Sequence, residues 1–139
     1  MKYWNPYLET LPRKEYNEIE LSYFRNMLSY AKERSILYRD KLKGIESKDI
    51  KSFNDLKKIP FTEKEEMRKY QEMDPFPYGG LLGSDIREVT TFRQTSGTTG
   101  KPIYVPETYE SWQWRIEVWC HILYMAGFRP HHRIFLPFV

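Results

Sequence analysis

The most informative part of the chain is the stretch VTTFRQTSGTTGKPIYV, residues 89–105. Its first run is rich in β-branched and aromatic residues and predicts a strand at 88–94, and residues 103–105 predict a second strand. The loop between them, residues 95–102, contains two glycines, four hydroxyl side chains and one lysine. A loop of this composition is commonly a hairpin turn whose lysine is solvated, so the order of its residues must decide between that interpretation and a ligand site.

The loop carries the groups that are needed to hold a polyphosphate. Glycine lets the backbone turn sharply and approach a ligand closely, and successive N–H groups in such a turn can form a concavity that binds anions. The hydroxyl groups add neutral donors, Lys101 adds a positive charge, and Pro102 restricts the exit into the second strand. The candidate phosphate-binding residues are Thr95, Ser96, Gly97, Thr98, Thr99, Gly100 and Lys101.

This loop does not follow the Walker pattern. In a Walker motif a Ser or Thr comes directly after the lysine and a helix follows the loop. Here Pro102 follows Lys101, and a strand is expected next. A helix dipole is therefore not the expected anchor for the phosphate groups.

Residues 1–71 are interpreted as a helical segment. Between residues 14 and 34, apolar side chains recur at three- and four-residue steps, which predicts an amphipathic helix. These side chains are Leu21, Phe24, Leu28 and Ala31. A second helix is expected from Tyr38 to Lys43, ended by Gly44.

Two capping boxes predict two further short helices in this segment. Ser52 lies three residues before Asp55, and Thr62 lies three residues before Glu65. Pro60 separates the two helices because it cannot continue the first. Their many charged residues predict a solvated outer face.

A Pro- and Gly-rich loop, residues 72–87, separates the helical segment from residues 88–139. After the second strand, Thr108 can cap a helix at 109–125, whose wide apolar arc should be covered on more than one side. The arc comprises Trp112, Ile116, Val118, Trp119, Ile122, Leu123, Met125 and Ala126. The apolar segment 133–139 is expected to begin as a buried strand.

The predicted order of elements indicates an α/β fold. A helical N-terminal segment precedes the first strands and helix of a larger nucleotide-binding domain, which residues 1–139 leave incomplete. Such a unit needs further strands to complete a sheet, and an exposed apolar edge favours association. The sequence therefore predicts part of a larger domain, or self-association through the apolar terminal strand. The helix tryptophans Trp112, Trp114 and Trp119 are expected to pack against the sheet.

The composition argues against several classes of function. The chain has 139 residues, of which 40% are hydrophobic, and the charges behind its net +3 are interspersed, so a nucleic-acid surface is not expected. The single cysteine excludes an intrachain disulfide, and no apolar run reaches membrane-spanning length. A cytoplasmic protein is therefore expected. No metal site is expected, because neither His131-His132 nor Cys120-His121 has the spacing of shared ligands.

Residues 95–102 closely resemble the signature loop of adenylate-forming enzymes. These enzymes are the acyl- and aryl-coenzyme A ligases, the luciferases and the adenylation domains of peptide synthetases. Further stretches resemble the phenylacetate–coenzyme A ligase branch: Trp4, the helical run 21–34, Tyr38-Arg39, residues 60–64 and Ala126-Gly127-Phe128. The resemblance covers essentially the whole chain, but roughly the first third of a typical member.

The resemblance implies a two-step reaction. A carboxylate attacks the α-phosphate of ATP with the help of Mg²⁺, giving an acyl-adenylate and pyrophosphate, and coenzyme A then displaces AMP to form a thioester. In such enzymes the signature loop holds the β- and γ-phosphates, and Lys101 would offset their charge. The hydroxyl donors would be Ser96, Thr98 and Thr99. The catalytic lysine is expected beyond Val139, and no catalytic or metal-binding residue is expected in this segment.

The same resemblance implies a small carboxylic acid, ATP and coenzyme A as partners. The acyl pocket is expected mostly downstream. Phe135 and Phe138 could approach it, but they are expected to be core residues of the last strand. The 139-residue chain is therefore expected to bind phosphate without catalysing the full reaction. Two alternatives remain open. One is adenylation with another acceptor, as in ligase-like enzymes that adenylate a deazaflavin cofactor, and the other is a non-catalytic, truncated interaction module.

Overall fold

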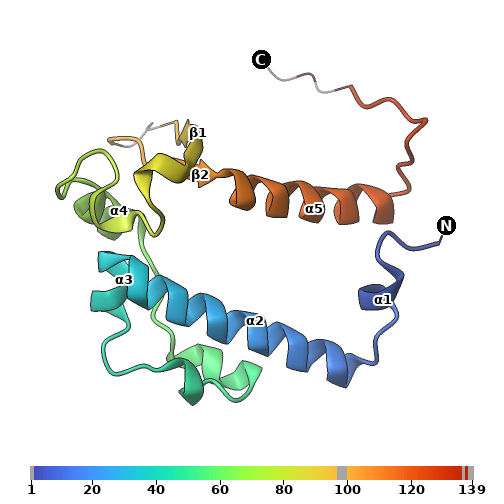
Figure 1. The fold of residues 1–139 in the computed structure, drawn as a ribbon, viewed down its shortest axis with the longest axis horizontal. Coiled ribbons are helices and arrows are strands. Elements are labelled where there is room, and N and C mark those ends of the chain that lie inside the picture. Colours follow the sequence, from blue (N-terminus) through green and yellow to red (C-terminus); the bar gives the residue numbers. More distant parts are fainter. Residues whose placement is uncertain (1, 97–99, 136, 138–139) are drawn as a thin grey trace.

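The structure is a computed structural model that describes residues 2–96, 100–135 and 137. Its helices are α1 (Pro6–Glu9), α2 (Arg13–Arg34), α3 (Ile36–Lys41), α4 (Lys64–Gln71) and α5 (Tyr109–Met125), and its strands are β1 (Val89–Gln94) and β2 (Tyr104–Thr108). Short 3-10 turns lie between them: η1 (Ser47–Asp49), η2 (Phe53–Lys58), η3 (Gly79–Leu81) and η4 (Ile86–Glu88). Figure 1 shows α2 and α5 along the long axis, with α3, α4 and the strands near one end and α1 near the other.

The hydrophobic core lies between α2 and the turns that follow α3. The predicted apolar stripe of α2 faces inward, because Leu28 is buried and Leu21 and Phe24 pack beside it. Leu42 and Ile50 complete the cluster, and Ile50 has no exposed surface. The apolar periodicity therefore predicted both the long helix and the face that it buries.

The second helix begins earlier than the sequence predicted. α3 starts at Ile36 instead of Tyr38, because Ser35 is extended and changes the direction of the chain after α2. The buried Ser35 hydroxyl donates to the carbonyl of Gly80 at 2.9 Å, and Leu37 in the first turn is buried. Tertiary burial thus decides where this helix begins.

One predicted capping box is confirmed and the other is displaced. Ser52 and Asp55 form the reciprocal hydrogen bonds of a capping box at the start of η2. At α4 the box is formed by Glu63 and Glu66, one residue later than the predicted pair. The Glu66 carboxylate is also ion-paired with Lys41 of α3, which favours this register of the helix.

The two predicted strands form an antiparallel hairpin around the glycine-rich loop. Gln94 pairs with Tyr104 next to the loop, and Val89 pairs with Thr108 at the other end. β2 is longer than predicted because its pairing with β1 continues to Thr108. The Thr108 Oγ1 accepts the N–H of Ser111 at 3.1 Å, so α5 begins directly after the strand, as predicted.

Two expectations for the C-terminal part are wrong within the described residues. No residue of α5 is buried, so its apolar arc is not covered on more than one side. Residues 133–135 do not form a strand, and Phe135 is 87% exposed instead of belonging to the core. The described strands pair with each other beside the start of α5, whereas residues 133–135 follow its end, where they have no strand to pair with. Phe138 lies outside the described residues.

Candidate functional site

The hairpin brings together the described residues of the predicted phosphate-binding loop. These are Thr95, Ser96, Gly100 and Lys101, whereas Gly97, Thr98 and Thr99 lie outside the described residues. The Thr95 N–H donates to the carbonyl of Ile103 at 3.0 Å, and the Ile103 N–H donates to Thr95 Oγ1 at 3.0 Å. The Thr95 hydroxyl oxygen therefore closes the base of the loop, a role that the sequence did not predict.

The last turn of α4 holds the exit of the loop. Arg68 Nε donates to the Lys101 carbonyl at 2.9 Å. The Gln71 side chain donates from Nε2 to the Pro102 carbonyl at 3.0 Å and accepts the Tyr104 N–H at 2.7 Å. Arg68 and Gln71 are 9% and 2% exposed. The solvated face predicted for the charged helices between Ser52 and Tyr70 is therefore wrong for Arg68.

No local sequence signal marked Arg68 and Gln71 as neighbours of the loop. They are polar residues three positions apart in a short charged helix, a pattern typical of a face in contact with water. Their partners lie 31 to 33 residues later in the chain. Only the tertiary fold brings the helix and the loop together.

Lys101 forms an ion pair with Glu72, the residue that follows α4. Its Nζ lies 2.5 Å from Glu72 Oε1, and both side chains are exposed. The hydrogen bond to the Glu72 carboxylate raises the pKa of Lys101 above its ordinary value of 10.5. Exposed ion pairs contribute little stability, so the Lys101–Glu72 pair can open at small cost.

Both the backbone conformation at position 100 and the nearby Arg68 side chain favour glycine there. Its φ is +149°, and a Cβ added to it would lie 3.2 Å from Cζ of Arg68. The sequence explained this glycine by close approach of a ligand, and the structure adds the close approach of a guanidinium. Arg68 Nη1 is paired with Glu65, whereas the buried Nη2 has no hydrogen-bond partner among the described residues.

A second polar cluster attaches α5 to the hairpin. The buried Glu107 carboxylate of β2 is paired with Arg115 of α5 and lies 3.5 Å from Arg93 Nε of β1. Both cations approach the Trp112 ring, whose centroid is 4.8 Å from Arg93 Cζ and 5.5 Å from Arg115 Cζ. The predicted packing of tryptophan against the sheet is therefore confirmed for Trp112, whereas the other two helix tryptophans are exposed.

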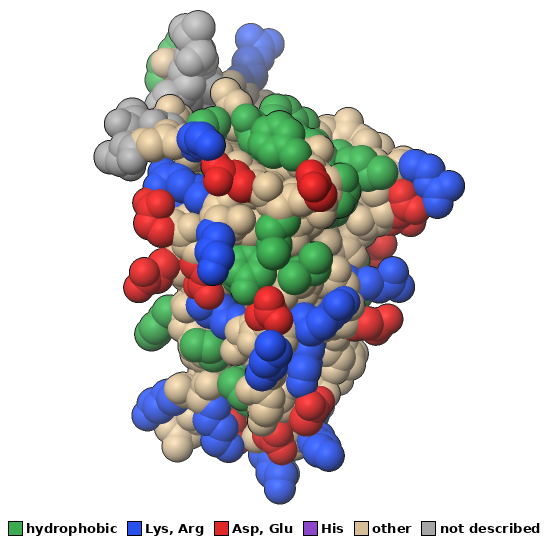
Figure 2. Space-filling view, turned by 90° about the vertical axis from the view of Figure 1, so that its left-hand side faces the viewer, with side chains coloured by type: hydrophobic (Ala, Val, Ile, Leu, Met, Phe, Trp, Pro, Cys, Tyr) green, Lys and Arg blue, Asp and Glu red, His purple; other side chains and the backbone are tan. Residues whose placement is uncertain are grey.

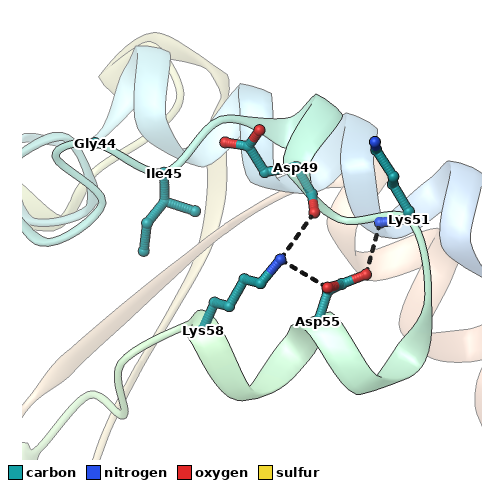
Figure 3. A pocket seen from close by; sticks show the side chains of 6 residues that line it. All are labelled: Gly44, Ile45, Asp49, Lys51, Asp55 and Lys58. Atoms are coloured by element: carbon teal, nitrogen blue, oxygen red, sulfur yellow. Dashed lines mark hydrogen bonds and ion pairs between the residues drawn. The ribbon is translucent and has the colours of Figure 1, made fainter.

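A hollow of about 330 Å³ lies beside η1 and η2, away from the loop. It is lined by Gly44, Ile45, Asp49, Lys51, Asp55 and Lys58. Figure 3 shows Lys58 directed toward Asp49 and Asp55, with Nζ 2.7 Å from Asp55 Oδ1 and 3.5 Å from the Asp49 carbonyl. Hydrogen bonds from Lys58 and Ser52 hold the pKa of Asp55 well below its usual range. These groups satisfy one another as in a helix cap, and the hollow is not a candidate ligand site.

The surface at the α3–α4 end carries mixed charge. Figure 2 shows Lys and Arg side chains interspersed with Asp and Glu on this face, with apolar patches between them. Within the described ranges, no group of three or more His, Cys, Asp or Glu side chains is placed to hold a metal ion. Of the helices described, none is long and apolar enough to cross a membrane. The loop and its α4 contacts are the described arrangement best suited to an anion.

Comparisons with known proteins show which proteins the chain resembles. No family model matches the chain. The phenylacetate–coenzyme A ligase of Thermus thermophilus is 35% identical over 129 residues, and that of Escherichia coli K12 is 28% identical over 137 residues. These matches cover 91% and 94% of this chain, but 28% and 29% of the two relatives. A crystal structure of 2-hydroxyisobutyryl-CoA ligase with 2-HIB-AMP and CoA matches with a TM-score of 0.84 and 28% identity, over 94% of this chain and 28% of that chain.

The loop-bearing hairpin, the helices before it and these similarities define the class of protein. The chain corresponds to a portion of an adenylate-forming ligase, as the resemblance of the signature loop predicted. Within that class, it corresponds to the N-terminal portion of phenylacetate–coenzyme A ligases and spans 28% and 29% of the length of the two relatives named above. The predicted fold class, a helical segment followed by the first strands and helix of the ligase large domain, is confirmed.

Proposed function

We propose that this chain supplies the pyrophosphate side of the active site of an ATP-dependent carboxylate–coenzyme A ligase. The observation that carries the proposal is the signature loop itself, positioned between two paired strands and held at its exit by α4. The similarity to phenylacetate–coenzyme A ligases supports a carboxylic acid as the substrate and coenzyme A as the acceptor. It favours coenzyme A over a deazaflavin-type acceptor.

In this proposal the loop binds the β- and γ-phosphates of ATP, which leave as pyrophosphate. The loop backbone and the hydroxyl groups of Ser96, Thr98 and Thr99 donate hydrogen bonds, while Gly97 and Gly100 allow close approach. Lys101 exchanges the Glu72 carboxylate for a phosphate oxygen. These residues position the leaving group and offset its charge, which helps the carboxylate to attack the α-phosphate. Coenzyme A then displaces AMP to form the thioester.

Mg²⁺ is expected to enter with the nucleotide, because this ion commonly keeps several waters and binds substrate phosphates with one or two carboxylates. The adenine pocket, the acyl pocket and the catalytic lysine are proposed to come from other parts of the ligase. Residues 1–139 would therefore bind the phosphates without completing the reaction.

The test is a titration of the isotopically labelled chain followed by nuclear magnetic resonance. Pyrophosphate and ATP with Mg²⁺ are expected to shift the amide signals of residues 95–96, 100–101 and 103. With phenylacetate, ATP and coenzyme A, the same chain is expected to form no thioester. An absence of loop shifts would reject the phosphate role, and thioester formation would reject the need for other parts of a ligase.

A second candidate function, an interaction module, is favoured by the exposed apolar face of α5. We define the α5 face as Val118, Trp119, Ile122 and Met125, which are all exposed; Ile122 lies three or four positions from each of the other three. A contiguous exposed apolar patch commonly marks an interaction site. We propose that a second copy of the chain covers the α5 face in the isolated polypeptide. The sequence predicted self-association through an apolar terminal strand, which the described residues do not form. In this proposal the α5 face is the surface of self-association instead.

Introducing charge on the α5 face tests this candidate. The double variant Trp119→Glu, Ile122→Glu is expected to convert a dimer to a monomer in sedimentation velocity, because glutamate at a contact must be desolvated. Phe61→Glu is the matched control, since Phe61 is exposed but lies outside α5. A wild-type chain that remains monomeric at high micromolar concentration rules out self-association through the α5 face.

A further inference from the structure

The last turn of α4 pairs with the loop exit as a strand would. The Gln71 amide donates to the Pro102 carbonyl and accepts the Tyr104 N–H. In a parallel β-ladder, the backbone N–H and C=O of one residue bond to two residues of the neighbouring strand. These two residues are two positions apart, as Pro102 and Tyr104 are. A buried helix side chain therefore takes the place of a neighbouring strand at the start of β2.

Arg68 reaches the same backbone one residue earlier. Its Nε bonds to the Lys101 carbonyl, and its guanidinium lies against Gly100, where an added Cβ would be 3.2–3.3 Å from Cζ and both terminal nitrogens. The buried Nη2 has no hydrogen-bond partner among residues 2–96, 100–135 and 137, and burying an N–H group in this way costs free energy. Hydrogen bonding within α4 therefore does not explain why Arg68 is buried here, whereas its contact with the loop does.

The loop needs an anchor of this kind. Residues 95–100 are all Gly, Ser or Thr, so they have no large apolar side chain with which to join a core. Ordering a flexible loop when a ligand binds costs conformational entropy, and a loop that is ordered beforehand avoids part of that cost. α4 can provide the anchor because it is itself attached to α3, through the Lys41–Glu66 ion pair and a 3.0 Å hydrogen bond from Tyr70 to Asp40.

We propose that Arg68 and Gln71 are positioning residues for the phosphate-binding loop. They hold the backbone of residues 100–104 so that Lys101 and the loop N–H groups meet the phosphate oxygens without further ordering. They act through this backbone and do not touch the substrate. The inference rests on the proposed function, because phosphate binding by the loop is itself proposed.

Two measurements on the 139-residue chain test this role. Arg68→Ala and Gln71→Ala are each expected to weaken pyrophosphate binding about tenfold in calorimetric titration, the equivalent of one hydrogen bond that orders the site. Amide hydrogen exchange at Tyr104 is expected to accelerate in Gln71→Ala without any ligand, because this N–H loses its acceptor. If Gln71→Ala does not fold, Gln71→Glu serves instead, since it retains the acceptor and loses only the donor to Pro102. It is then expected to weaken pyrophosphate binding and to leave Tyr104 protected.

Arg25→Ala is the matched control for Arg68→Ala. Arg25 also donates from its guanidinium to a backbone carbonyl, that of Ile50 at 3.2 Å, but it lies away from the loop. This variant should lower the thermal midpoint and leave pyrophosphate affinity unchanged, and Arg68→Lys should recover part of the affinity that Arg68→Ala loses. Equal loss of affinity in Arg25→Ala and Arg68→Ala, measured where both are folded, overturns the inference.

The failures of the two proposals are distinguishable. Absence of pyrophosphate binding by the wild-type chain rejects the proposed function, whatever the variants do. Normal pyrophosphate binding by Arg68→Ala and Gln71→Ala, with unchanged amide exchange at Lys101, Ile103 and Tyr104, rejects the positioning role and leaves the proposed function intact.

Discussion

Replacing Lys101 with alanine is expected to weaken pyrophosphate binding by roughly tenfold or more, because the loop loses its one cation and a charge-assisted hydrogen bond. The structure also predicts a variant that binds pyrophosphate more tightly than the wild type. Glu72→Gln removes the carboxylate that pairs with Lys101, so the same titration should show binding that is tighter by a few-fold. In the double variant the gain should disappear, because the effect of Glu72 passes through Lys101.

The control for these variants is another exposed ion pair. Lys43 lies 3.3 Å from Asp40, remote in sequence from the loop. Lys43→Ala changes the net charge as Lys101→Ala does and should leave pyrophosphate affinity nearly unchanged. Unaltered affinity in Lys101→Ala, or equal losses in Lys101→Ala and Lys43→Ala, would contradict a specific role for Lys101.

The pH dependence of the contribution of Lys101 to pyrophosphate binding follows from its ion pair with Glu72. Because the Glu72 carboxylate raises the pKa of Lys101 above 10.5, the stability that the pair contributes is fully present below this value and is lost as the pH rises through the raised pKa. Lys101 therefore remains protonated across the neutral range. Because pyrophosphate itself loses protons in this range, any change between about pH 6 and about pH 9 in the ratio of pyrophosphate affinities of wild type and Lys101→Ala should follow the ionisation of the ligand and not that of Lys101.

Ile50→Ala is expected to lower the free energy of unfolding by about 2–4 kcal/mol, because it leaves a cavity beside Leu28 and Leu42 in the core. A loss of this size is a large share of the net stability of a small domain. Urea denaturation should show a lower midpoint with little change in slope. Ile86→Ala is the control, since Ile86 is exposed and its truncation should cost no more than about 0.5 kcal/mol. A similar cost for both variants would show that the cluster around Ile50 is not the main core.

The parts of the fold that were predictable are those with local signals. The stripe of α2 follows the helical period, and the strands around the signature loop are marked by β-branched residues on both sides. Thr108 capped α5 as expected, because a cap acts on backbone groups only two or three residues away. The signature loop could be found for the same reason, since its residues are consecutive.

The errors occurred where a residue's environment depends on distant parts of the chain. Segment 133–135 is apolar enough for a buried strand, but a strand forms only where a neighbour can pair with it. Helix α5 has the apolar arc of a covered helix, yet within the described residues nothing covers its outer face. The pattern of apolar residues indicates which side chains a segment can bury. Whether these side chains are buried depends on the structure around the segment.

The sequence by itself determined the loop, its flanking strands and the class of ligase that the loop indicates, because consecutive residues create both the turn and its chemistry. Only the tertiary structure decided what supports the loop. It placed Arg68 and Gln71 beneath residues 100–104, and it paired Lys101 with Glu72. The physical reason is that these hydrogen bonds and ion pairs join residues about thirty positions apart, and no local pattern of polar residues specifies which distant backbone group they meet.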